Sequence, residues 1–135
     1  MKLNQVRSTK VKLFAIAVLL FGLTFCRPKE RSMVVKASAY NSLEAQTDNA
    51  PNISAWGDTL KPGMKVIAIS RDLLDSGLIY QKEVRIDGFE GTYVVLDKMK
   101  QRYTKRIDIY MGEDLKKAKE WGVQEVTIHW IPEKK

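Results

Sequence analysis

The sequence predicts a single, mainly β domain built as a small barrel, and three observations support this prediction. The chain has 135 residues, enough for one sizeable core and too few for two. Between residues 33 and 131, short runs rich in β-branched residues alternate with turn signals. Two stretches of that span have helical character. Five to seven short strands with two short helices are typical of a compact β-barrel, and a sandwich is the alternative.

The elements follow one another along the chain with clear boundaries. Residues 33–40 alternate as a first strand, and residues 41–62 form a long, turn-rich loop with no period. Loops of this length in small domains are usually functional or disordered. The later elements are a strand at 65–70, a short helix at 71–77, a hairpin of 82–87 and 92–96, a strand at 106–110, a helix at 113–121 and a strand at 125–131.

The first 26 residues are expected to be a signal or an anchor rather than part of the fold. Four basic residues precede the apolar stretch from Leu13 to Phe25, whose 13 residues suit a signal core better than a transmembrane helix. Leu23-Thr-Phe-Cys26 resembles a lipoprotein lipobox, with Phe25 where that pattern has a small residue. Lipidation at Cys26, cleavage elsewhere and an uncleaved short anchor are the alternatives. Each places the domain outside the cytoplasm, and we expect it in the bacterial cell envelope, in the periplasm or as an outer-membrane lipoprotein.

Residues 27–33 are polar and charged, as in a tether, and precede a domain predicted at 34–131. Residues 1–25 hold four basic residues and no acid, which leaves +3 of the formal charge of +7 for the rest. So modest a charge argues against a nucleic-acid binder. One cysteine and one histidine exclude a Cys/His zinc site, and we expect no metal and no cofactor. His129 lies in an alternating run and is expected on a strand face.

Two aspartates stand out because each lies where a strand is expected. Asp97 ends the run Tyr93-Val-Val-Leu-Asp97, and Asp108 lies inside Arg106-Ile-Asp-Ile-Tyr110. Aspartate is disfavoured in strands and is rarely buried unless it is paired. The connector 98–106 holds five of the 23 basic residues and no acid, so it can balance both carboxylates. The pair is therefore either a functional site or two strand-end caps paired to the connector at Arg102, Lys105 or Arg106.

Five short segments over residues 34–131 carry a resemblance to a known family. They are Thr47-Asp48-x-x-Pro51-x-Ile-Ser-Ala-x-Gly57, Gly63-x-x-Val-Ile-Ala-Ile69, Val95-Leu-Asp97, Arg106-Ile-Asp108-Ile-Tyr110 and Ala118-x-x-Trp-Gly-Val123. Together they resemble the 3D (three-aspartate) domain, which is shared with the catalytic barrel of membrane-bound lytic transglycosylase A and related muralytic enzymes. The spacing of eleven between the last two aspartates matches that family.

The resemblance implies a six-stranded double-psi β-barrel that cleaves the MurNAc–GlcNAc bond of peptidoglycan and forms 1,6-anhydro-MurNAc ends. It implies that Asp108 is the general acid and base and that Asp97 binds or orients the substrate. The chain departs from the family at Lys98-Met-Lys100, where Thr-Gly-Gly is usual, and at Ser70, where the third aspartate usually lies. That third carboxylate is replaced by Asp48, by Asp72 or by nothing.

Further residues are candidates for binding the glycan strands of peptidoglycan. They are Thr47, Asp48, Trp56, Lys98, Arg102 and Tyr103. Each has a plain structural alternative: Thr47 and Asp48 can form a turn before Pro51, Trp56 and the tyrosine can pack, and the basic residues can form a solvated loop. We expect a monomer that contacts the membrane only through its N-terminal anchor or lipid. A non-catalytic peptidoglycan-binding module on the same barrel is the alternative function.

Overall fold

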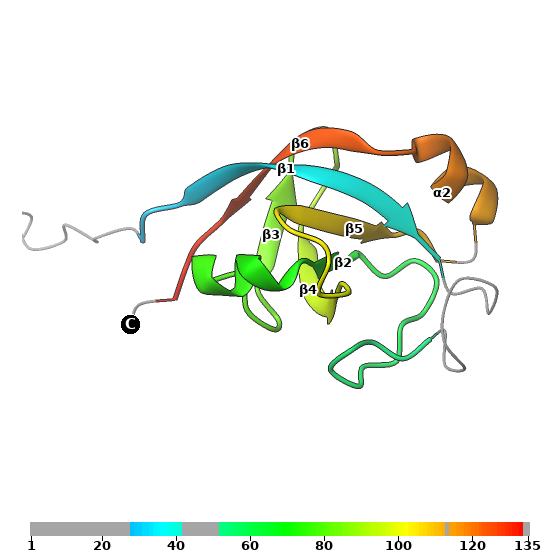
Figure 1. The fold of residues 1–135 in the computed structure, drawn as a ribbon, viewed down its shortest axis with the longest axis horizontal. Coiled ribbons are helices and arrows are strands. Elements are labelled where there is room, and N and C mark those ends of the chain that lie inside the picture. The colour runs from blue at the N-terminus through cyan, green and yellow to red at the C-terminus, as the bar shows by residue number, and fades with distance from the viewer. Residues whose placement is uncertain (1–27, 42–51, 113, 134–135) are drawn as a thin grey trace, which may run out of the picture.

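A computed structural model describes residues 28–41, 52–112 and 114–133 (Figure 1). The predicted signal segment with Cys26, and the candidate ligands Thr47 and Asp48, lie outside these residues. The strands are β1 (Arg31–Tyr40), β2 (Val66–Ile69), β3 (Glu83–Ile86), β4 (Tyr93–Lys98), β5 (Arg106–Tyr110) and β6 (Gln124–Trp130). They close into one barrel in the order β1-β5-β2-β4-β3-β6, which confirms the predicted six-stranded barrel.

The strand pairing has an internal symmetry. The β1–β5 and β2–β4 pairs are parallel, and the other four pairs are antiparallel. Exchanging β1, β2 and β3 for β4, β5 and β6 leaves every pair and its direction unchanged. This arrangement is the double-psi barrel that was predicted. The segments that leave β1 and β4, residues 41–65 and 99–105, are therefore equivalent crossings of the two halves.

The barrel interior is filled by alternate β-branched residues of the strands. In β5, Ile107 and Ile109 are buried, while Asp108 between them is only half-buried. In β1, Val35 and Ala37 point inward in the same way. Successive side chains of a strand point to opposite faces, so this alternation sends Asp108 to the outside of the barrel wall.

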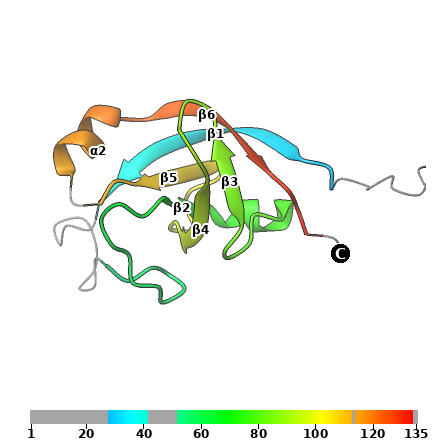
Figure 2. The same cartoon turned by 180° about the vertical axis from the view of Figure 1, so that it is seen from behind.

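Two short helices flank the barrel and lie on opposite sides of it in both views (Figures 1 and 2). The 3-10 helix η2 (Arg71–Ser76) ends at Gly77, whose φ of 86° is the left-handed conformation that glycine adopts readily. The α-helix α2 (Leu115–Trp121) begins after Asp114, whose carboxylate accepts a hydrogen bond from the Lys117 amide. Both helices were predicted within two residues of these bounds.

The edges of the domain differ slightly from the sequence prediction. Strand β1 begins at Arg31 and pairs there with Trp130 of β6, so part of the expected tether belongs to the barrel wall. His129 lies on β6, where its Nε2 is 2.9 Å from a carboxylate oxygen of Asp87. Within the three described ranges, no helix has the length and apolar character needed to cross a membrane.

Candidate active site

Four residues from four neighbouring strands form one row across the barrel wall. Ser38 of β1 pairs with Asp108 of β5, Asp108 pairs with Ala68 of β2, and Ala68 pairs with Asp97 of β4. We call Ser38, Asp108, Ala68 and Asp97 the acid row. The two carboxylates thus come from strands that are separated only by a strand whose side chain at this level is a methyl group.

Asp97 reaches the outer face because β4 is irregular. Val95 pairs with Ile67 inside the barrel, but the next pair is Asp97 with Ala68, so Leu96 has no partner on β2. Strict alternation would have sent Asp97 inward with Val95. The extra residue in the strand is a bulge, and bulges commonly redirect side chains beside functional sites. Both carboxylates therefore face the same side of the barrel wall.

Asp108 is held by a serine and lies near an arginine. The Ser38 hydroxyl donates a short hydrogen bond to Oδ1 of Asp108. The same Ser38 oxygen accepts hydrogen bonds from Nε and Nη2 of Arg106, at 3.2 and 2.9 Å. Arg106 therefore acts on Asp108 through Ser38, and no nitrogen of a described lysine or arginine lies within 4.0 Å of the Asp108 carboxylate. The Asp108 oxygens are not locked in a bidentate pair.

Burial raises the pKa of Asp108 above the ordinary value of an aspartate, and the charge of Asp97 adds to the rise. The Ser38 hydrogen bond and the charge of Arg106 lower the same pKa, but the net direction is upward. A carboxyl group that keeps its proton to higher pH is suited to act as a general acid.

Asp97 anchors the long loop to the barrel. Its Oδ1 accepts hydrogen bonds from the backbone amide of Ala55, at 2.7 Å, and from its own neighbour Lys98, at 2.8 Å. Within the described part of the loop, the Ser54 hydroxyl contacts the amide and the carboxylate of Asp58. Asp97 therefore holds the described part of the loop to the acid row at Ala55.

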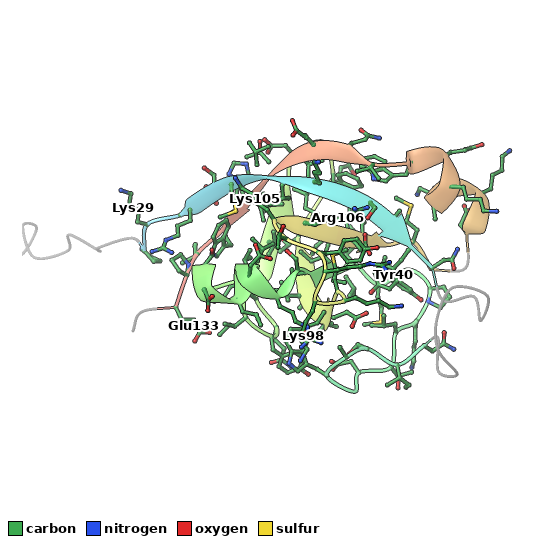
Figure 3. All side chains as sticks on the ribbon, in the orientation of Figure 1. Lys29, Tyr40, Lys98, Lys105, Arg106 and Glu133 are labelled. Atoms are coloured by element: carbon green, nitrogen blue, oxygen red, sulfur yellow. The ribbon has the colours of Figure 1, made fainter. Side chains whose placement is uncertain are left out.

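Tyr40 is a site residue that the sequence did not single out (Figure 3). Burial raises the pKa of its hydroxyl, and the carboxylates of Asp97 and Asp108 add to the rise. No described residue forms a well-aligned hydrogen bond with this buried hydroxyl. Its ring packs on Tyr110, with ring centres 5.4 Å apart. Tyr40 ends β1, 57 positions before Asp97, so spacing in the sequence gave no signal of their proximity.

The basic connector balances the carboxylates only in part, because the charge of Arg106 lowers the pKa of Asp108 but no connector cation forms an ion pair with either acid among the described residues. The ammonium of Lys98 lies 4.6 Å from the centre of the Trp56 ring, and Trp56 also packs on Tyr80 at 5.2 Å. The guanidinium groups of Arg102 and Arg106 each lie 4.9 Å from the Tyr103 ring. The alternative in which Arg102, Lys105 or Arg106 forms an ion pair with either acid is not what the described residues show.

Asp72 is hydrogen-bonded to the basic connector, and no described hydrogen bond joins it to the acid row. Its Oδ2 accepts a hydrogen bond from the Lys105 amide at 2.9 Å, where Lys105 has a positive φ of 50°. Ser70 is fully buried, and its hydroxyl accepts from the Arg106 amide at 3.0 Å. The two residues hold the crossing between β4 and β5 in place. Asp72 thus has a structural partner in the connector, and its place as the third acid stays a prediction.

The described residues hold no cluster of three or more metal-ligating side chains, counting His, Cys, Asp and Glu. A cavity of about 540 Å³ is lined by β3, β6 and the chain after β6, including Trp130 and Glu133, and none of the acid-row residues lines it. The acid row is identified by its chemistry and its register.

Comparison with known proteins supports the fold. No protein-family model matches the chain, and no curated protein matches it. The apo form of an expansin from Clavibacter michiganensis matches with a TM-score of 0.50 and 13% identity, over 78% of this chain and 52% of that one. A mutant Clavibacter michiganensis expansin in complex with cellohexaose matches with a TM-score of 0.47 and 13% identity, over 73% and 49%. The chain spans about half the length of these expansins. The resemblance to the 3D domain stays a prediction.

Proposed function

We propose that the protein cleaves the glycan strands of peptidoglycan as a lytic transglycosylase, with Asp108 as the general acid and base. The observation that carries the proposal is the acid row. It places a half-buried aspartate with a raised pKa beside a second carboxylate, on one outer face of the barrel.

One proton-carrying group is enough for this reaction. Asp108 donates its proton to the glycosidic oxygen as the bond from C1 of MurNAc to that oxygen breaks. The 6-hydroxyl of the same MurNAc attacks C1 and gives its proton to the Asp108 carboxylate, so the enzyme ends in its starting state. Holding the 6-hydroxyl against C1 lowers the activation free energy by up to about 7–11 kcal/mol through proximity. Acid–base help from one side chain is typically worth about 10²–10⁴-fold.

The remaining residues have supporting roles in this proposal. Asp97 is the candidate to accept a hydrogen bond from a sugar hydroxyl, in addition to those that its Oδ1 accepts from the amides of Ala55 and Lys98. Trp56 and Tyr103 offer aromatic faces, although Lys98 covers one and the arginines cover the other, so these cations must move for a sugar to stack. Lys98 and Arg102 then remain as donors to the glycan. Thr47 and Asp48 are kept as candidate ligands from the sequence.

The proposal includes export and tethering, which rest on the sequence alone. A basic, apolar N-terminal segment followed by Cys26 places the barrel in the cell envelope, where peptidoglycan is found. The tether from residue 27 lets a monomeric barrel reach the murein while lipid or an anchor holds the chain at a membrane.

Purified sacculi provide the test. Wild-type protein and Asp108→Asn are incubated with sacculi at equal concentration, and soluble products are analysed by mass spectrometry. We expect anhydro-muropeptides from the wild type and a loss of about 10²–10⁴-fold in the variant. Products that contain a reducing MurNAc end instead would change the reaction to hydrolysis by water. Equal product from both proteins would remove Asp108 from the mechanism.

A non-catalytic glycan-binding module is the second candidate. Its support is that Ser38 and Arg106 both favour the ionised form of Asp108, which cannot donate a proton. Sacculus pull-down without any soluble product supports this candidate. Cellohexaose, a β-1,4 glucan without stem peptides or N-acetyl groups, is a useful competitor in that assay because it separates general glycan binding from murein recognition.

A further inference from the structure

A separate hollow lies beside the acid row, where β5 ends. It has a volume of about 360 Å³, and its lining comes from the segment before β2, the β3–β4 hairpin, the end of β5 and α2. Its apolar wall includes Met64, Phe89, Tyr93 and Met111. Phe89 and Tyr93 meet edge to face, with ring centres 5.8 Å apart, a favoured geometry for an aromatic pair.

The hollow adjoins the two acids through a pair of tyrosines. Tyr110 lines it and follows Asp108 by two positions on β5. Side chains two positions apart on a strand share a face and are separated by roughly 7 Å. The Tyr110 ring packs on Tyr40, whose hydroxyl is close enough to both carboxylates for them to raise its pKa. A substrate held at Asp108 therefore has this hollow within reach of a short substituent.

The rim of the hollow carries more positive than negative charge. Lys65 and Lys117 contribute two cations, and Asp114 contributes one carboxylate that already caps α2 through the Lys117 amide at 2.9 Å. The Lys65 ammonium donates to the Glu90 carbonyl at 2.5 Å. A side chain at Gly91 would place a Cβ 2.6 Å from that ammonium, so the glycine leaves room for it. No described carboxylate lies within 4.0 Å of the Lys65 ammonium.

We infer that this hollow binds the short acidic peptide that MurNAc carries, the stem peptide of peptidoglycan. The inference rests on the proposed function, because it takes the sugar at Asp108 to be MurNAc. The apolar wall suits the methyl groups of alanyl residues, and Lys65 with Lys117 suits a peptide carboxylate. An unsubstituted sugar would leave both features unused.

The first test compares substrates with and without stems. Lys65→Met, Lys117→Met and the double variant are assayed on glycan strands that carry stems and on strands stripped by an amidase. We expect the double variant to raise KM roughly tenfold on stem-bearing strands, with kcat unchanged and no effect on stripped strands. Lys119→Met, an exposed lysine on the same helix outside the hollow, is the matched control. An equal change on both substrates, or none, overturns the inference.

The second test does not depend on turnover. Muramyl dipeptide is titrated into the full-length Asp108→Asn protein with labelled methionine methyl groups. We expect shifts at Met64 and Met111, which line the hollow, and none at Met33, which does not. Lys65→Met should weaken this binding. Specific shifts without any cleavage of sacculi would mean that the hollow is correctly assigned and the proposed reaction is wrong. Cleavage without these shifts, or shifts confined to other methionines, would refute the hollow alone.

Discussion

Strands β1 to β3 and strands β4 to β6 pair in the same pattern, yet equivalent positions of the two halves carry different side chains. The exchange that maps one half onto the other places Ser38 on Asp97 and Ala68 on Asp108. The first half thus presents a hydroxyl and a methyl where the second half presents two carboxylates. The small residues leave space beside each acid.

The two crossings also differ between the halves, in length and in the residues that hold them. The crossing of the first half, residues 41–65, is long, and its Ala55 amide binds Asp97 of the other half. The crossing of the second half, residues 99–105, is short and is fixed by Ser70 and Asp72 of the first half. Each half therefore secures the loop of the other. The chemistry gathers on one half, while the scaffold that positions it is divided between both.

Substitutions that give both halves the same acid-row residues should have the largest effect on stability. Ala68→Asp would place a third carboxylate between the two acids, at a side chain that is only 4% exposed. We expect a loss of roughly 3–5 kcal/mol in the free energy of unfolding, the usual cost of an unpaired buried charge. Ser38→Asp should cost less, because Arg106 already contacts the Ser38 oxygen. Urea unfolding measures both, and equal losses would contradict the comparison.

The next largest effect is expected from removing the carboxylate of Asp97, whose hydrogen bond to Ala55 joins the two halves. Asp97→Ala leaves the amides of Ala55 and Lys98 without their acceptor, so we expect a loss of about 1–3 kcal/mol in stability. Asp97→Asn keeps an oxygen in place and should lose less. Hydrogen exchange should show faster exchange at these two amides in the alanine variant. Unchanged exchange rates there would mean that Asp97 does not hold the loop.

A smaller effect is expected from Ser38→Ala. The Ser38 hydrogen bond lowers the pKa of Asp108, so its removal should raise that pKa further. A general acid with a higher pKa stays protonated to higher pH. The alkaline limb of the activity profile should therefore move upward, with a change of a few-fold in kcat and little change in KM. A uniform loss of activity at every pH would indicate a structural role only.

The smallest effect is the pH dependence of stability in Asp108→Asn. The pKa of Asp108 is raised in the folded protein, so the folded state keeps a proton that the unfolded state releases. Stability of the wild type therefore falls as pH rises from the ordinary aspartate pKa through the raised one. The variant lacks this fall and should gain stability relative to the wild type across that window. Thermal unfolding at a series of pH values measures the difference.

Features that depend on neighbouring residues could be predicted from the sequence, and features that depend on contacts between distant segments could not. The strands and both helices follow from local alternation and turn residues, and the barrel follows from their number. The outward position of Asp108 follows from its place between Ile107 and Ile109. The outward position of Asp97 does not, because it depends on a bulge that only the pairing with β2 reveals.

The neighbours of the two acids were harder to predict. Ser38 and Tyr40 lie on a strand far from the acids in the sequence, and they reach them only through the parallel pairing of β1 with β5. The sequence showed that the connector is positively charged, but it did not show which groups its cations contact. Arg102 and Arg106 both stack on Tyr103, and Arg106 also bonds the Ser38 oxygen, so neither forms an ion pair with a carboxylate of the acid row.

The pairing has a consequence for how the chain becomes ordered. Every one of the six strand pairs joins a strand of the first half to a strand of the second, and neither half contains a pair of its own. Strand β1 in particular finds both neighbours near the opposite end of the polypeptide. Such long sequence separations slow folding, because loop closure must precede the contacts that reward it. Neither half can complete its strand pairing before the other half is present. We therefore expect the barrel to fold in one cooperative step.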